Sequence, residues 1–160
     1  MQPAFPGSRN PFGVADAPDP DAKDVEEFAA GVDLCGLDDD PNAPAWSGAP
    51  TGERHEPLQG TWSSRWNGGA DPSIASDTPE RWKAGTARLE TVGERVFILF
   101  DWSDGARQAL VDARRDGPNT LRGRYVNLGD LSITRPWVGL IVDPRRIEGC
   151  WSHGRLDFRR

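Results

Sequence analysis

The residues from Pro57 to Gly69, PLQGTWSSRWNGG, open a part of the chain in which apolar and polar positions alternate. Trp62 and Trp66 fall on one side of this alternation, and Thr61 and Ser63 fall on the other. Successive side chains of a β-strand point to opposite faces, so both indoles face the same way. The pattern therefore predicts a strand with one buried and one solvent-facing side.

The same kind of run recurs along the rest of the chain, separated by short turn signals such as Ser103-Asp104-Gly105. The predicted strands are 58–66, 85–92, 95–102, 106–115, 120–128, 135–142, 146–151 and 155–160. No segment between them is long enough for a helical crossover, so we expect an antiparallel meander. A sheet of eight twisted strands tends to close and remove its edges. We therefore expect an all-β, up-and-down barrel over residues 57–160, with a two-sheet sandwich as the alternative.

Residues 1–56 differ from this body in composition and charge. They carry 3 basic and 12 acidic residues, a net charge of −9, whereas residues 57–160 carry 16 and 13, a net charge of +3. The first twenty residues are rich in proline and lack periodicity, which predicts disorder. Residues 21–31 predict a short helix with acidic residues in its first turns. We expect a largely disordered acidic tail that serves as a linker or as a docking motif for a protein partner.

The chain contains no apolar run of the length of a signal peptide core or a membrane span. Its two cysteines, Cys35 and Cys150, lie far apart, as do its two histidines, His55 and His153. These spacings favour neither a disulfide nor a metal site. We expect a reduced, cytoplasmic protein without a cofactor.

The pattern Leu58-x-Gly60-x-Trp62 at the start of the first strand, together with Arg159 and Arg160 at the end of the last, resembles the calycin superfamily of lipocalins, fatty-acid-binding proteins and avidins. The resemblance implies a meander barrel that binds small, often apolar ligands. It also implies that Trp62 lies at the closed end, with Arg159 or Arg160 packed across it in a cation–π contact. The Thr-Asp-Tyr motif of lipocalins is absent from this sequence.

Alternate connections of a meander lie at the same end of a barrel, which brings 67–84, 103–105, 129–134 and 152–154 together. The opposite end has only tight turns, so we expect the end with the long connections to be the mouth. Most of the tryptophans lie at strand ends on this side. The candidate ligand-binding residues are Trp66, Trp82, Trp102, Tyr125, Trp137, Trp151, Arg135 and His153.

A ring of indoles at the mouth has two interpretations. It can offer flat surfaces to a sugar, a planar aromatic compound, a base or a peptide, or it can plug the barrel. Motifs for nucleophilic, phosphate-binding, dinucleotide-binding or zinc-dependent catalysis are absent from the sequence. A non-catalytic module that binds a small ligand or a peptide is therefore favoured. The alternatives are a small enzyme that uses Asp104, Asp130, Arg135 and His153, and a filled barrel with a structural or oligomerisation role.

Two surfaces suggest macromolecular partners. The strand 95–102 is apolar on both sides, so its outer face needs a cover, which the tail, another protein or a second copy of the chain would supply. Arginines on two neighbouring strands suggest nucleic acid as a further partner: Arg107, Arg114, Arg115, Arg122 and Arg124. The 13 acidic residues of the same body disfavour nucleic acid, because cross-strand ion pairs account for such arginines.

Overall fold

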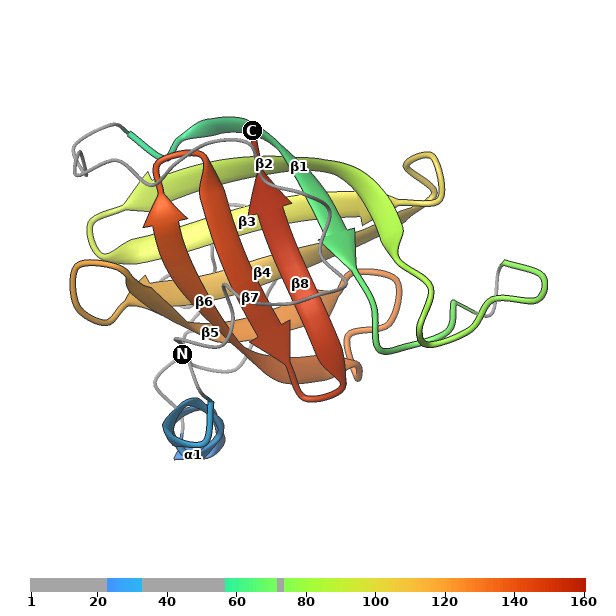
Figure 1. Cartoon of the computed structure of the whole chain (residues 1–160), viewed down its shortest axis with the longest axis horizontal. Coiled ribbons are helices and arrows are strands. Elements are labelled where there is room, and N and C mark those ends of the chain that lie inside the picture. Colours follow the sequence, from blue (N-terminus) through green and yellow to red (C-terminus); the bar gives the residue numbers. More distant parts are fainter. Residues whose placement is uncertain (1–22, 33–56, 72–73) are drawn as a thin grey trace, which may run out of the picture.

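The computed structural model describes residues 23–32, 57–71 and 74–160. The described residues form one helix and eight strands (Figure 1). Their bounds are α1 (Lys23–Ala30), β1 (Gly60–Trp66), β2 (Lys83–Val92), β3 (Arg95–Trp102), β4 (Arg107–Arg115), β5 (Thr120–Asn127), β6 (Thr134–Asp143), β7 (Arg146–Trp151) and β8 (Gly154–Arg159). The remainder of the predicted tail lies outside the described residues.

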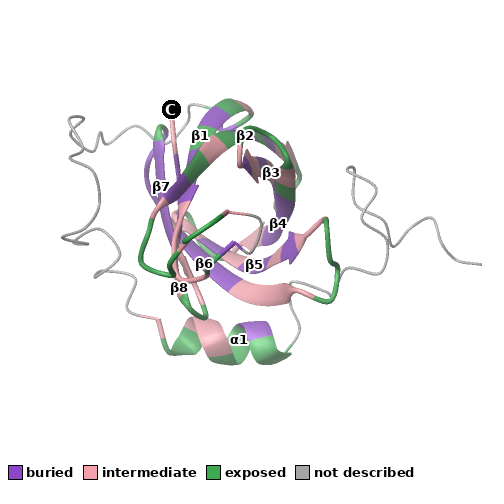
Figure 2. Cartoon of the chain, turned by 90° about the vertical axis from the view of Figure 1, so that its right-hand side faces the viewer, coloured by how far each residue is buried: buried purple, intermediate pink, exposed green. Residues whose placement is uncertain are grey.

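The eight strands form a closed barrel in which each strand pairs with its neighbours in the chain. All pairings are antiparallel, and β1 pairs with β8 to close the cylinder. Figure 2 shows the strands as a ring around the barrel axis. The predicted up-and-down barrel is confirmed, and the two-sheet alternative is wrong. The strand ends agree with the predicted ones to within about two residues, the usual uncertainty of such boundaries.

Inward-facing side chains of alternate residues fill the barrel. On β3, the side chains of Val96, Ile98 and Phe100 belong to the main core cluster, as their shared parity predicts. The opposite face of β3 is also buried, because Phe97 packs in a second cluster with Leu110 and other apolar side chains of the outer wall. Both faces of β3 are therefore packed against other side chains of the barrel, the inner face in the core and the outer face in the second cluster.

The end of the barrel with the tight turns is closed by Trp62 and the C-terminal arginine. The Trp62 indole is 2% exposed and donates its Nε1–H to the carbonyl of Leu58 at 2.8 Å. The guanidinium of Arg160 lies 4.5 Å from the centre of that indole. Arg160 also donates to backbone carbonyls of Pro57 and Pro144, at 2.7 and 3.1 Å. These contacts tie the last residue of the chain to the segment that precedes β1.

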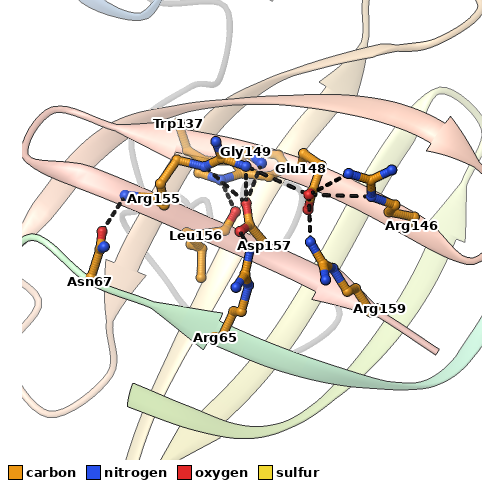
Figure 3. A network of polar contacts seen from close by, with 10 residues as sticks. All are labelled: Arg65, Asn67, Trp137, Arg146, Glu148, Gly149, Arg155, Leu156, Asp157 and Arg159. Atoms are coloured by element: carbon orange, nitrogen blue, oxygen red, sulfur yellow. Dashed lines mark hydrogen bonds and ion pairs between the residues drawn. The ribbon is translucent and has the colours of Figure 1, made fainter. Parts of the chain in front are cut away.

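A network of buried charges joins β1, β7 and β8 on the outer wall, where the barrel closes (Figure 3). Asp157 accepts hydrogen bonds from Arg65 at 2.7 Å and from the backbone N–H of Gly149 at 2.9 Å. Glu148, also fully buried, binds Arg159 at 2.6 Å and Arg146 at 3.1 Å. Burial, followed by the charge of Glu148, raises the pKa of the Asp157 carboxyl. The network thus links the first and last strands through side chains, in addition to their backbone pairing.

The helix α1 lies against the outside of β5 and β6 (Figure 2). It falls within the range 21–31 in which the sequence predicts a helix. Val25 is its buried residue, and Asp24 forms an ion pair with Arg124 of β5. In the described part of the chain, no helix is both long and apolar enough to cross a membrane.

Candidate functional site

An open depression of about 470 Å³ lies at the end of the barrel that carries the long connections. We call it the cup. Its walls come from the β1–β2 connection on one side and from the β5–β6 connection on the other. The residues that line it are Trp66, Gly68, Gly69, Ala70, Asp71, Trp102, Arg107, Tyr125, Asn127, Gly129, Asp130, Ile133, Arg135, Trp151 and His153. Its volume is in the range of small-molecule sites.

Four aromatic side chains form the floor of the cup: Trp102, Trp66, Trp151 and Tyr125, which we call the aromatic floor. Their rings meet edge to face, with centroid separations of 5.2 Å for Trp102–Trp66, 6.4 Å for Trp66–Trp151 and 5.3 Å for Trp151–Tyr125. These arrangements match the preferred geometry of aromatic pairs. Each ring comes from the mouth end of a different strand, so the closure of the barrel brings them together.

The space directly below the aromatic floor is small. The void between the floor and the underlying Phe100 and Leu156 measures about 20 Å³. The rings therefore plug the barrel and, on their upper side, form the base of an open depression.

The described part of the β1–β2 connection, residues 67–71 and 74–82, is anchored beside the cup by Lys83. The Lys83 ammonium is buried and donates to the backbone carbonyls of Gly69 at 2.6 Å and Thr78 at 3.0 Å. It also lies 3.0 Å from the carboxylate of Asp77 and 4.7 Å from the centre of the Trp66 ring. These contacts attach the connection to the aromatic floor.

Two carboxylates complete this anchor. Asp77 accepts hydrogen bonds from the Asp71 backbone N–H at 2.6 Å and from Arg81 at 2.6 Å. Burial opposes the charged form of Asp77, but these hydrogen bonds and Lys83 outweigh it and lower the pKa of the carboxyl. Asp71 in turn accepts the Nε1–H of Trp102 at 2.7 Å. On this side of the cup, the charged side chains are thus held by hydrogen bonds and ion pairs within the wall.

The remaining polar groups of the cup lie on the opposite side. Tyr125 and Arg135 face each other across β5 and β6 in register. Burial raises the pKa of the Tyr125 hydroxyl, and the nearby charge of Arg135 partly offsets this effect. Asp130 is turned into its own loop, where it accepts a hydrogen bond from the Ser132 hydroxyl at 2.6 Å. His153 stacks at 5.1 Å beside Trp151.

Of the eight candidate residues predicted from the sequence, the structure brings six into the cup: Trp66, Trp102, Tyr125, Trp151, Arg135 and His153. Trp137 is not among them, and its prediction as a rim residue is wrong. Its indole is fully buried and donates its Nε1–H to the carbonyl of Leu156 at 3.1 Å. Gly139 and Gly149 face each other across β6 and β7 and leave space for this indole, since a Cβ at either position would lie 2.3 or 2.4 Å from it. The ring turns into this glycine slot, away from the mouth.

Trp82 also lies outside the cup, in contrast to the prediction. It precedes β2 and stacks against the outward-pointing guanidinium of Arg65, 4.1 Å from the ring centre. It lines a neighbouring hollow, which shares Gly68 and His153 with the cup. The side chain of Arg65 points to the outside of β1. Because Trp82 stacks on this guanidinium, it also lies on the outside of the barrel.

Arg107 lines the cup, although the sequence groups it with four other arginines as a possible contact for nucleic acid. It has the same parity as Ala109 and Val111, which face the core, so it points inward at the mouth. The parity of Arg107 in the sequence is the signal that indicates its inward position. Of the other four arginines, Arg114 and Arg122 are cross-strand neighbours, and Arg122 and Arg124 form ion pairs with Asp116 and Asp24.

The residues considered for catalysis are not all brought together. Asp130, Arg135 and His153 line the cup, whereas Asp104 lies in a different hollow beside Ile74 and Arg81. Within residues 23–32, 57–71 and 74–160, no cluster of three or more His, Cys, Asp or Glu side chains is arranged to hold a metal ion.

Comparison with known proteins adds a fold-level similarity. No protein-family model matches the chain, and no curated protein matches it. A solved structure of a redesigned β-barrel is similar to it, with 14% sequence identity and a TM-score of 0.46. The alignment covers 64% of this chain and 90% of that protein.

Proposed function

We propose that this protein is a non-catalytic binding module that takes a small ligand with a flat apolar face into the cup. The observation that supports this proposal most directly is the aromatic floor at the base of an open depression of about 470 Å³. Flat ligands bind well on indole and phenol rings because stacking removes apolar surface from water on both partners. The volume suits a small molecule better than a peptide.

The polar groups around the floor support a specific orientation of the ligand. Small-molecule sites combine an apolar base with a few polar groups that fix direction and select the partner. Arg107, Arg135, Asn127 and His153 lie above the rings and offer both donors and acceptors. The anchored β1–β2 connection keeps one wall of the cup in place, which limits the ordering that binding requires.

We also propose that the barrel is calycin-like in its construction. The eight-stranded meander and the packing of Arg160 across Trp62 support this proposal.

The test is a screen of small aromatic and sugar-like compounds against the full chain by saturation-transfer NMR, which reports contact from the side of the ligand. We expect flat compounds to bind the wild type and to lose contact when Trp151→Leu removes one face of the floor. Trp82→Leu is the matched control, since Trp82 lies outside the cup. Equal binding by both variants, with unchanged unfolding midpoints, would overturn the assignment of the site to the cup.

A further inference from the structure

Two arginines occupy inward-facing positions at the rim of the barrel. Arg135 of β6 has the same parity as Ile141, which belongs to the core, and pairs in register with Tyr125 of the aromatic floor. Arg107 pairs in register with Trp102, another member of the floor. A cation at an inward-facing position of a small barrel loses part of its hydration, so it needs compensation from a neighbouring group.

The two arginines differ in how this compensation is supplied. Arg107 lies 3.8 Å from the carboxylate of Asp71, which forms part of the wall. Arg135 donates to the backbone carbonyl of its neighbour Thr134 at 3.0 Å. Among the residues that the structure describes, no carboxylate lies within ion-pair distance of Arg135. The cup therefore contains one half-buried guanidinium whose charge is not neutralised by a described side chain.

The other acidic group on that side does not fill this role. Asp130 lines the cup, but its carboxylate accepts hydrogen bonds from the hydroxyl and the backbone N–H of Ser132 at 2.6 and 3.1 Å. These bonds lower the pKa of Asp130 and hold the carboxylate in the β5–β6 turn. The position opposite Arg135 is left to a group that enters from solvent.

The chemistry of that group follows from the guanidinium. Its planar donors match the two oxygens of a carboxylate, and such charge-assisted pairs are stronger than neutral hydrogen bonds. The aromatic floor begins at Tyr125, beside Arg135, and continues to Trp151. A ligand that uses both features carries an acid group at one edge of a planar apolar body.

We propose that the ligand of the cup is a small aromatic carboxylic acid, with its ring on the aromatic floor and its carboxylate on Arg135. This inference rests on the proposed function, because it specifies the class of ligand for the same site. No covalent step is involved: the acid binds as its anion and leaves unchanged.

The test compares two probes with the same ring system, one an anion and the other its neutral amide. Isothermal titration calorimetry of the full chain gives the dissociation constants of 2-naphthoate and of 2-naphthamide. Their ratio measures how much the carboxylate adds to the affinity of the same ring system. We expect the wild type to bind 2-naphthoate about 10-fold or more tightly than 2-naphthamide, as for other charge-assisted pairs. Arg135→Gln should remove this preference and leave the affinity for 2-naphthamide unchanged, which a merely unfolded or distorted cup would not do.

The control is Arg88→Gln, at an exposed arginine on the outer wall whose side chain is 66% accessible. It changes the net charge equally and should keep the preference for 2-naphthoate. Arg135→Lys should keep part of the preference, since it retains the charge without the planar donors.

Two results would overturn the inference, and they are distinguishable. Equal affinity of the wild type for both probes, or a preference that survives Arg135→Gln, removes the carboxylate site and leaves the binding function in place. Failure of both probes, together with every flat compound of the screen, to bind the wild type removes the binding function and this inference with it.

Discussion

The glycine slot that holds Trp137 predicts a large effect of a very small substitution. In Gly139→Ala the added methyl carbon would lie 2.3 Å from Cη2 and 2.7 Å from Cζ2 of the indole. Carbon atoms in van der Waals contact lie about 3.5–4.0 Å apart, so the ring must move by about 1 Å. Trp137 is fully buried and hydrogen-bonded to Leu156, and its indole also packs against the facing Gly149.

The magnitude follows from two opposing effects. Overpacking of a dense core costs about 1–3 kcal/mol, whereas replacing glycine by alanine in a strand recovers about 0.5–1 kcal/mol of backbone entropy. We expect Gly139→Ala to lower the free energy of unfolding by about 1–2 kcal/mol. Urea unfolding followed by tryptophan emission measures this difference. Gly31→Ala is the control, since the nearest atom to its Cβ is a carbonyl oxygen at 3.6 Å outside the barrel.

A double-mutant cycle separates the steric clash from other causes. Trp137→Phe removes the two ring atoms that the new methyl group would meet, so Gly139→Ala should cost less in that background than in the wild type. The same unfolding midpoint for Gly139→Ala and the wild type, or an equal cost in both backgrounds, would refute the slot as the reason for the position of Trp137.

Three further predictions concern the charged and titratable groups. Because the pKa of Asp77 is lowered in the folded state, its anchoring contribution is full above about pH 4 and is lost only as the pH falls through that lowered value. Amide exchange in the β1–β2 connection of the wild type should therefore stay slow at about pH 3. In Asp77→Asn, which has no carboxyl group to protonate, exchange should be faster and should not show the dependence on pH that comes from Asp77. Burial raises the pKa of Cys150 to about 11, so in a Cys35→Ser background iodoacetamide should alkylate it about 100-fold more slowly at pH 8 than an unfolded cysteine, and equal rates would contradict the burial. Asp157→Asn leaves Arg65 buried without its anion and should lower the free energy of unfolding by about 3 kcal/mol in urea titrations, whereas an unchanged midpoint would show that the network does not stabilise the seam between β1 and β8.

The barrel could be predicted from the sequence because each strand and turn is marked by residues that are close together in the chain. Period-two alternation and turn residues such as those at Ser103-Asp104-Gly105 define each strand, and a strand count of eight without crossovers leaves few ways to arrange a sheet. Parity also placed Trp66, Trp102 and Trp151 on the inside at the same end.

The rest of the site depends on contacts between strands. Parity predicts the face on which a side chain lies but not its neighbours on other strands. Trp137 and Trp151 pair in register and both point inward, yet one turns down into the barrel and the other forms the floor. The difference lies in Gly139 and Gly149, whose mutual pairing is a property of the register and not of either strand alone. The sequence places Lys83 in the predicted connection 67–84, whereas in the structure it begins β2 and anchors the wall.

The most direct test of the cup as a binding site uses the indole N–H signals of the chain as a map. In ¹⁵N-labelled protein titrated with 2-naphthoate, we expect the Nε1–H signals of Trp66 and Trp151, in the floor, to shift. The signals of Trp62 and Trp137, buried at the closed end and in the glycine slot, should stay in place. Shifts of Trp62 and Trp137 as large as that of Trp151, or the absence of any shift, would contradict a ligand site on the aromatic floor.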